Sequence, residues 1–194
     1  AGTGKTFLLR TIADLAQRVG LRVELMASTG RAAKVLSAST GRPASTIHRT
    51  IYRASTQMQE EGGSFQLGRV STTTPTLFIV DEASMISGDT GEMTPFGSGN
   101  LLDDLLSYVW SADEAKLIFV GDTAQLSPVG TPLSDALNAE VLTSRYGLHV
   151  YGMELREVVR QKRGGILHNA TQLRELLDEY ADEDPEEILP IHLE

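Results

Sequence analysis

The sequence predicts one α/β domain in which helices flank a parallel β-sheet. Residues 77–80 and 116–120 form continuous apolar runs, which are typical of strands buried on both faces. Segments with helical spacing of apolar residues alternate with such runs, as in repeated strand–helix units. A length of 194 residues suits one domain with a sizeable core.

The pattern predicts each element in chain order. Apolar residues follow helical spacing directly after residue 6, and Gly20 is a plausible stop for this first helix. We then expect a strand at 23–27, helices at 30–38 and from 46, a polar surface excursion at 54–75 with a hairpin as one possibility, a strand at 77–80, a loop at 87–99, a helix at 100–110, a strand at 116–120, a strand at 147–154 and a final helix at 165–180. Residues 181–194 are expected to be a disordered acidic tail.

The composition excludes several classes of protein. Hydrophobic residues make up 41% and charged residues 22%, which is typical of soluble globular domains. No apolar run is long enough to cross a bilayer, so we expect no membrane partner. The absence of cysteine excludes disulfides and thiolate-bound metals and agrees with a cytoplasmic location.

The net charge of −9 is unevenly distributed. Residues 1–53 contain nine Lys or Arg against Asp14 and Glu24, a balance of +7, whereas residues 54–194 contain eight basic and 24 acidic residues, a balance of −16. Binding of phosphate requires a local positive surface rather than a positive total. Charge therefore permits nucleic-acid binding without establishing it.

A phosphate-binding motif opens the first helix. Gly4-Lys5-Thr6 matches the second half of the P-loop pattern G-x-x-x-x-G-K-[ST]. Backbone amides of Gly2, Thr3 and Gly4 would surround phosphate oxygens, Lys5 would reach the β- and γ-phosphates, and the Thr6 hydroxyl would ligate Mg²⁺. The first glycine and the strand before it would lie upstream of residue 1, so we expect the first strand of the fold to be missing from this chain.

The second chemical signal is a pair of carboxylates at the end of the buried strand at 77–80. Asp81 suits the Mg²⁺ ligand of a P-loop enzyme, and Glu82 suits the base that polarises the attacking water. By itself an Asp-Glu pair is more often a solvated strand end. Together with Gly4-Lys5-Thr6, it predicts a site for ATP and Mg²⁺.

Residues 120–130 carry the resemblance to a family. The segment Val120-Gly121-Asp122-Thr123-Ala124-Gln125-Leu126-Ser127-Pro128-Val129-Gly130 resembles motif III of superfamily 1 helicases, G-D-x-x-Q-L-x-P-V. The resemblance implies a RecA-like P-loop fold. It also implies that the amide of Gln125 contacts the γ-phosphate and links it to the DNA-binding surface.

Two segments narrow the resemblance to RecD-like helicases. Residues 29–36 and 40–49 are similar to the Ia region of that family, which lies along single-stranded DNA. The resemblance makes candidate DNA contacts of Thr29, Thr46 and His48, with charge from Arg31 and Lys34. A histidine that only packs in the interior is an equally good interpretation of His48. The remaining histidines lack metal-ligand spacing.

A fourth motif lies near the end of the chain. Residues 154–161 resemble motif IV of the same family, which ends in Arg-Gln and makes Arg160 a candidate arginine finger. The implied organisation is a first RecA-like ATPase domain at 1–153 and, at 154–180, motif IV with a helix leading to a second RecA-like domain. That second domain, single-stranded DNA and possible nuclease or recombination subunits are the implied partners.

Three functions follow from these patterns. The first is the motor domain of an ATP-dependent DNA helicase, which by analogy moves 5′ to 3′ in recombination, repair or conjugation. In the second, the chain binds nucleotide and DNA without turnover by itself. The third and least favoured is a P-loop kinase of small molecules, which would leave the motif at 120–130 without a role.

Overall fold

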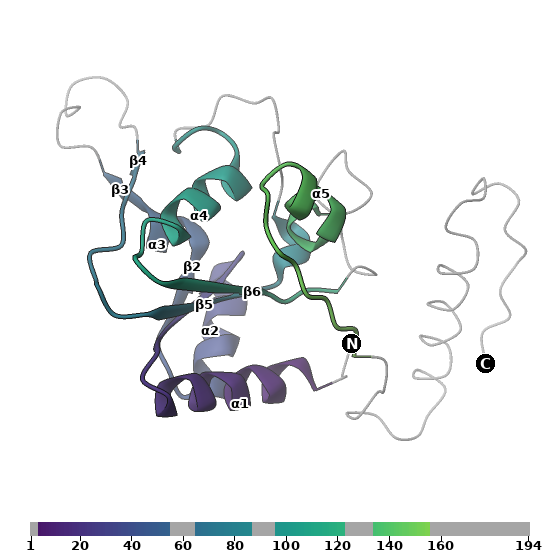
Figure 1. Cartoon of the computed structure of the whole chain (residues 1–194). Coiled ribbons are helices and arrows are strands. Elements are labelled where there is room, and N and C mark those ends of the chain that lie inside the picture. Colours follow the sequence, from purple (N-terminus) through teal and green to yellow (C-terminus); the bar gives the residue numbers. More distant parts are fainter. Residues whose placement is uncertain (1–3, 55–64, 87–95, 123–133, 156–194) are drawn as a thin grey trace, which may run out of the picture. The chain divides into compact units, whose positions relative to one another are not determined.

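The computed structural model describes residues 4–54, 65–86, 96–122 and 134–155 (Figure 1). The chain divides into two compact units, Lys5–Met153 and a second unit made of residues 1–4 and 154–194. Of the second unit the structure describes only Gly4, Glu154 and Leu155. Every helix and strand in the described part of the chain belongs to the Lys5–Met153 unit.

A parallel sheet forms the centre of this unit, as the sequence predicted. Its four described strands have the order β2-β1-β5-β6 and are paired in parallel throughout. They are β1 (Arg22–Ala27), β2 (Ala44–Thr46), β5 (Thr76–Asp81) and β6 (Ala115–Phe119). Five consecutive residues of β5, Thr76 to Val80, are buried, which explains why this strand is a continuous apolar run in the sequence.

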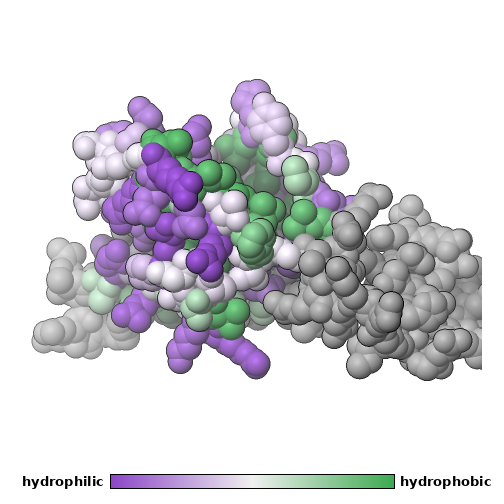
Figure 2. Space-filling model, turned by 90° about the horizontal axis from the view of Figure 1, so that it is seen from below, coloured by the Kyte–Doolittle hydropathy of each residue, from purple (hydrophilic) through white to green (hydrophobic). Residues whose placement is uncertain are grey.

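Helices cover both faces of the sheet (Figure 1). On one face α1 (Lys5–Arg18) and α2 (Gly30–Thr40) bury a cluster that includes Leu9, Leu36 and Ile79. On the other face α3 (Ile47–Ile51) and α4 (Leu101–Val109) pack in a larger cluster around Phe78. Seen from the α1 side, the surface is mostly hydrophilic with small hydrophobic areas (Figure 2).

Short elements complete the unit. A hairpin of β3 (Tyr52–Ala54) and β4 (Phe65–Leu67) is antiparallel, so the hairpin considered for residues 54–75 exists, although residues 55–64 lie outside the described residues. Single turns of 3₁₀ helix, η1 (Ala83–Met85) and η2 (Asp135–Leu137), precede the short α5 (Ala139–Ser144).

One predicted element is wrong. Residues 147–155 contain no strand, although the sequence predicted one at 147–154. Leu148 and Val150 within it are partly buried and pack against the core of the α3/α4 face without forming a strand. The short β2 and α5 were not predicted. The final helix at 165–180 and the acidic tail lie outside the described residues.

The described helices were compared with the length and hydropathy of membrane-spanning helices. Among the residues that the structure describes, no helix combines the length and the apolar character needed to cross a bilayer.

Candidate functional site

Strand polarity gathers the predicted site at one edge of the sheet. Parallel pairing aligns Ala27 with Asp81 and Val80 with Phe119, so the carboxyl ends of β1, β5 and β6 lie side by side. The backbone at Ala83 donates to Val120 O at 2.9 Å, which extends this contact beyond the strand ends. Ligands of α/β proteins bind at this edge of the sheet.

Lys5, the first residue of α1, reaches the same edge. Its Nζ donates to Gly121 O at 3.3 Å and lies 3.7 Å from Asp122 Oδ2. The Asp122 side chain is only 7% exposed, so this ion pair is screened less than a surface pair. Gly4, directly before the helix, has φ +83, a conformation that favours glycine and is typical of a loop that folds tightly around phosphate.

Asp122 is a site residue that sequence analysis did not single out. It lies in the motif at 120–130, but the resemblance assigned a role there only to Gln125. The signal that could have found it is its position: an acidic residue directly after a buried parallel strand points to the same edge as Asp81.

The two predicted carboxylates lie where β5 ends. Asp81 Oδ1 accepts a hydrogen bond from its neighbour's backbone, Glu82 N, at 2.9 Å. Glu82 has φ 54 and ψ 41, the left-handed conformation, and among the described residues no other non-glycine residue has positive φ. Such a conformation is costly for a residue with a Cβ and is concentrated at functional sites.

The Glu82 carboxylate is also poorly satisfied. Its Oε2 is buried and has no hydrogen-bond partner among the described residues. Burial raises the pKa of Glu82, the charges of Asp81 and Asp122 raise it further, and Lys5 opposes them. Burial likewise raises the pKa of Asp81, against the hydrogen bond from Glu82 N and the charge of Lys5. The site therefore holds a strained carboxylate with a free acceptor and raised basicity.

The donor set fits a divalent cation bound together with phosphate. The charges of Asp81, Glu82 and Asp122 outnumber the single charge of Lys5, so the edge has an excess of negative charge that a cation would offset. Half-buried Thr6 lies in the first turn of α1, one residue from Lys5. Within the described part of the chain, no three His, Asp or Glu residues are grouped as metal ligands. A magnesium ion here would take its remaining ligands from phosphate and water.

The predicted DNA contacts fall at the ends of β1 and β2, which are neighbours in the sheet. Thr29 and Thr46 are the N-cap residues of α2 and α3, and their hydroxyl oxygens accept from Ala32 N and Arg49 N, each at 3.2 Å. Register places Thr46 opposite Ala27, so both threonines lie at the same edge of the sheet. Each O–H remains available as a donor to phosphate.

Arg31 and Lys34 are exposed on α2, whereas His48 is half-buried. The His48 ring lies 5.6 Å from the Tyr52 ring and 5.2 Å from the Phe96 ring, and burial lowers its pKa. The structure thus gives His48 the packing role that was the alternative interpretation. Its contact with DNA stays a prediction.

Four predicted site residues lie outside the described residues: Gly2, Thr3, Gln125 and Arg160. Their roles remain those implied by the resemblance.

Comparisons with known proteins agree with this geometry. A family model described as "AAA domain" matches residues 1–188. The ATP-dependent RecD2 DNA helicase of Deinococcus radiodurans is 35% identical over 167 residues, 86% of this chain and 21% of that protein. An uncharacterised protein of Methanocaldococcus jannaschii is 34% identical over 151 residues, 71% of this chain and 12% of that protein. The chain thus spans about a fifth or less of these relatives.

Among solved structures, Bacteroides sp. Pif1 in complex with ADP-AlF4 matches with a TM-score of 0.51 and 22% identity, over 90% of this chain and 40% of that one. At this identity the match supports the fold, a RecA-like parallel sheet with flanking helices. Because the family model covers nearly the whole chain, the protein belongs to the AAA domain family.

Proposed function

We propose that this chain is the motor domain of an ATP-dependent DNA helicase, coupling ATP hydrolysis to movement along single-stranded DNA. One observation carries the proposal: the strained Glu82, with its free buried oxygen, lies at the strand edge that Lys5 reaches from the start of α1. The Deinococcus radiodurans relative is named an ATP-dependent DNA helicase, which supports the same chemistry here.

Each residue of the edge has a distinct task in this proposal. Lys5 leaves Gly121 O and Asp122 and binds the γ-phosphate, so Asp122 competes with ATP for the ammonium group. Thr6 and Asp81 fit Mg²⁺, which when bound neutralises charge on the phosphates. Glu82 Oε2 accepts a hydrogen bond from the attacking water and takes its proton; a raised pKa makes this carboxylate a stronger base.

Residues beyond the described part complete the site in the proposal. Gln125 senses the γ-phosphate, and Arg160 supplies positive charge as an arginine finger. The family resemblance supports an ATPase domain at 1–153, followed at 154–180 by motif IV and a link to a second RecA-like domain.

Single-stranded DNA is the proposed track. Thr29 and Thr46 offer hydroxyls and helix-start amides to phosphates, and Arg31 and Lys34 supply exposed charge nearby. Movement from 5′ to 3′, and a place in recombination, repair or conjugation, are proposed from the family resemblance.

The test is ATP hydrolysis by the full-length protein, with and without single-stranded DNA. Glu82→Gln should lower turnover by roughly 10²- to 10⁴-fold, because the water loses its base, while binding of an ATP analogue is retained. Lys5→Ala should lower turnover and, unlike Glu82→Gln, should also weaken nucleotide binding. Glu140→Gln, an exposed position on α5, serves as the matched control. Unchanged turnover in Glu82→Gln would refute the assigned base.

The same experiment separates the rival functions. Binding of an ATP analogue without turnover in the same sample would favour a module that only binds nucleotide. Phosphoryl transfer to a metabolite, indifferent to DNA, would favour the kinase.

A further inference from the structure

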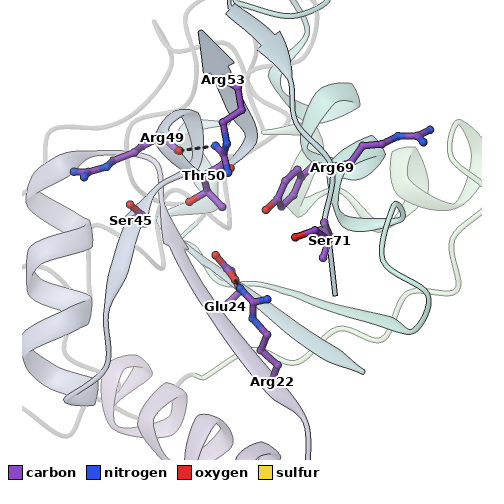
Figure 3. Close-up of a pocket in the computed structure, with 10 residues that line it drawn as sticks. Arg22, Glu24, Ser45, Arg49, Thr50, Arg53, Arg69 and Ser71 are labelled. Atoms are coloured by element: carbon purple, nitrogen blue, oxygen red, sulfur yellow. Dashed lines mark hydrogen bonds and ion pairs between the residues drawn. The ribbon is translucent and has the colours of Figure 1, made fainter. Parts of the chain in front are cut away.

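A basic pocket lies on the α3/α4 face of the sheet, and the proposed ATP chemistry does not use it. Its volume is about 300 Å³, and β1, α3, β3, the segment after β4 and α4 all contribute to its lining. Figure 3 shows the labelled side chains around it, among them Arg22, Arg49, Arg53 and Arg69.

The pocket is separate from the nucleotide edge. Arg22 and Glu24 lie in the first half of β1, while Lys5 and Glu82 lie beyond the carboxyl ends of the strands. Arg22 lies five positions before Ala27, the last residue of β1, which corresponds to roughly 16 Å along an extended strand. A ligand in the pocket would therefore not occupy the ATP site.

Positive charge dominates the pocket. Its lining includes four arginines and one acidic residue, Glu24, in a chain whose net charge is −9. Glu24 is already paired, since its Oε2 lies 2.7 Å from Arg22 Nη2. Three guanidinium groups therefore lack a carboxylate among the residues that line the pocket.

Backbone hydrogen bonds fix part of this arginine group. Arg53 Nη1 donates to the carbonyls of Arg49, Thr50 and Tyr52 at 2.9–3.2 Å, which fixes it at the end of α3. Gly68 N donates to Ile51 O at 2.7 Å, so the segment carrying Arg69 is bonded to the same helix end. The fold therefore fixes the Arg53 guanidinium and the backbone from which Arg69 projects, while the Arg49 and Arg69 side chains are exposed.

Two of the guanidinium groups are unengaged. Within the described residues, the side chains of Arg49 and Arg69 make no hydrogen bond or ion pair. Figure 3 shows Arg49 and Arg69 at opposite rims of the pocket, with their guanidinium groups directed outward and Ser45, Thr50 and Ser71 between them. Guanidinium groups with hydroxyls nearby are the groups that recognise phosphate.

We propose that this pocket binds backbone phosphates of a polynucleotide, as a contact additional to the strand-end surface of Thr29 and Thr46. The choice of a polynucleotide as the ligand rests on the proposed function. The positive groups lie on opposite sides of an open pocket. This arrangement suits a chain of phosphates that crosses the pocket better than it suits a single enclosed anion.

The test compares two double variants of the full-length protein. Arg49→Ala with Arg69→Ala removes the unengaged pocket charges. Arg10→Ala with Arg18→Ala removes the same charge from exposed positions on α1, on the other face of the sheet. Affinity for a fluorescein-labelled single-stranded oligonucleotide is measured by anisotropy over a range of salt concentrations, with thermal melting to verify folding.

Loss of two phosphate contacts should reduce the magnitude of the slope of log affinity against log salt by about 1.4. At 0.1 M salt the variant should then bind the oligonucleotide ~20-fold more weakly than the unaltered protein. We expect this change in the pocket variant alone, with ATP hydrolysis in the absence of DNA unchanged. Equal slopes in the two variants would overturn the proposal while leaving the motor function intact.

Two further outcomes identify other failures. In the first, inorganic phosphate at constant ionic strength stabilises the unaltered protein but not the pocket variant, while the two proteins bind DNA equally well. This result would assign the pocket to a small anion and overturn its assignment to a polynucleotide. Failure of the unaltered protein to bind the oligonucleotide at all would instead overturn the proposed function, and this inference with it.

Discussion

Two acidic side chains in this molecule, half-buried Glu82 and buried Asp104, differ in whether their carboxylate oxygens find donors. Glu82 lies in a left-handed backbone conformation, and its Oε2 has no hydrogen-bond partner among the described residues. Asp104, in α4, is 5% exposed, yet its Oδ2 accepts from Tyr52 Oη at 2.7 Å and from Ser98 N at 2.9 Å. Both carboxylates have a buried oxygen, but only that of Asp104 accepts hydrogen bonds from other described residues.

The difference separates a functional site from a structural one. A buried acceptor without a donor costs about 1–3 kcal/mol, so the fold tolerates it where a ligand or a water supplies the donor. A satisfied buried carboxylate instead fixes its neighbours: Asp104 ties β3, through Tyr52, to the turn that precedes α4. The same hydrogen bond and burial raise the pKa of Tyr52, so this phenol remains a donor.

Replacement of Glu82 by Gly would sharpen the comparison most. Hydrolysis should fall at least about 10²-fold with loss of the base, while the free energy of unfolding rises by about 1 kcal/mol, because glycine adopts the left-handed conformation without strain. Chemical denaturation and turnover measure the two effects. Glu82→Ala retains the strain and is the control; equal stability of the two variants would argue against stored strain.

At the structural carboxylate, the corresponding change is Gly97→Ala. A Cβ at Gly97 would lie 1.9 Å from Asp104 Oδ2, so the carboxylate must leave its donors. We expect a loss of about 2–3 kcal/mol of unfolding free energy, with turnover per folded molecule unchanged. Gly20→Ala is the matched control: it also has positive φ but open space around it, and should cost about 1 kcal/mol. Equal losses would refute the packing argument.

The smallest expected effect concerns pH. The base form of Glu82 exists above its pKa, so turnover at saturating ATP should fall as pH decreases through that raised value. The negative charge of Asp122 helps to raise the pKa of Glu82. Asp122→Asn should therefore move the acid limb of the kcat profile to lower pH. Asp113→Asn, which is exposed, is the control. An acid limb that does not move would remove Asp122 from the electrostatics of the base.

Motif chemistry made the nucleotide edge predictable. Gly4-Lys5-Thr6 and Asp81-Glu82 are local patterns, and strand polarity alone requires the ends of parallel strands to share one edge. Asp122 was missed because the resemblance was used to assign a role only to Gln125, although the motif at 120–130 also has an aspartate as a fixed position. The strand predicted at 147–154 was wrong: Leu148 and Val150 pack against the core, but side chains can be buried in this way without pairing in a sheet.

By itself the sequence determined the α/β class and the buried strands at 77–80 and 116–120, and it predicted the residues of a phosphate site, because apolar periodicity and short motifs are local properties. Only the tertiary structure decided that His48 packs against Tyr52 and Phe96, that Lys5 meets Asp122, and that arginines from four separate segments surround one pocket. Those facts depend on contacts between residues far apart in the chain, which sequence spacing does not encode.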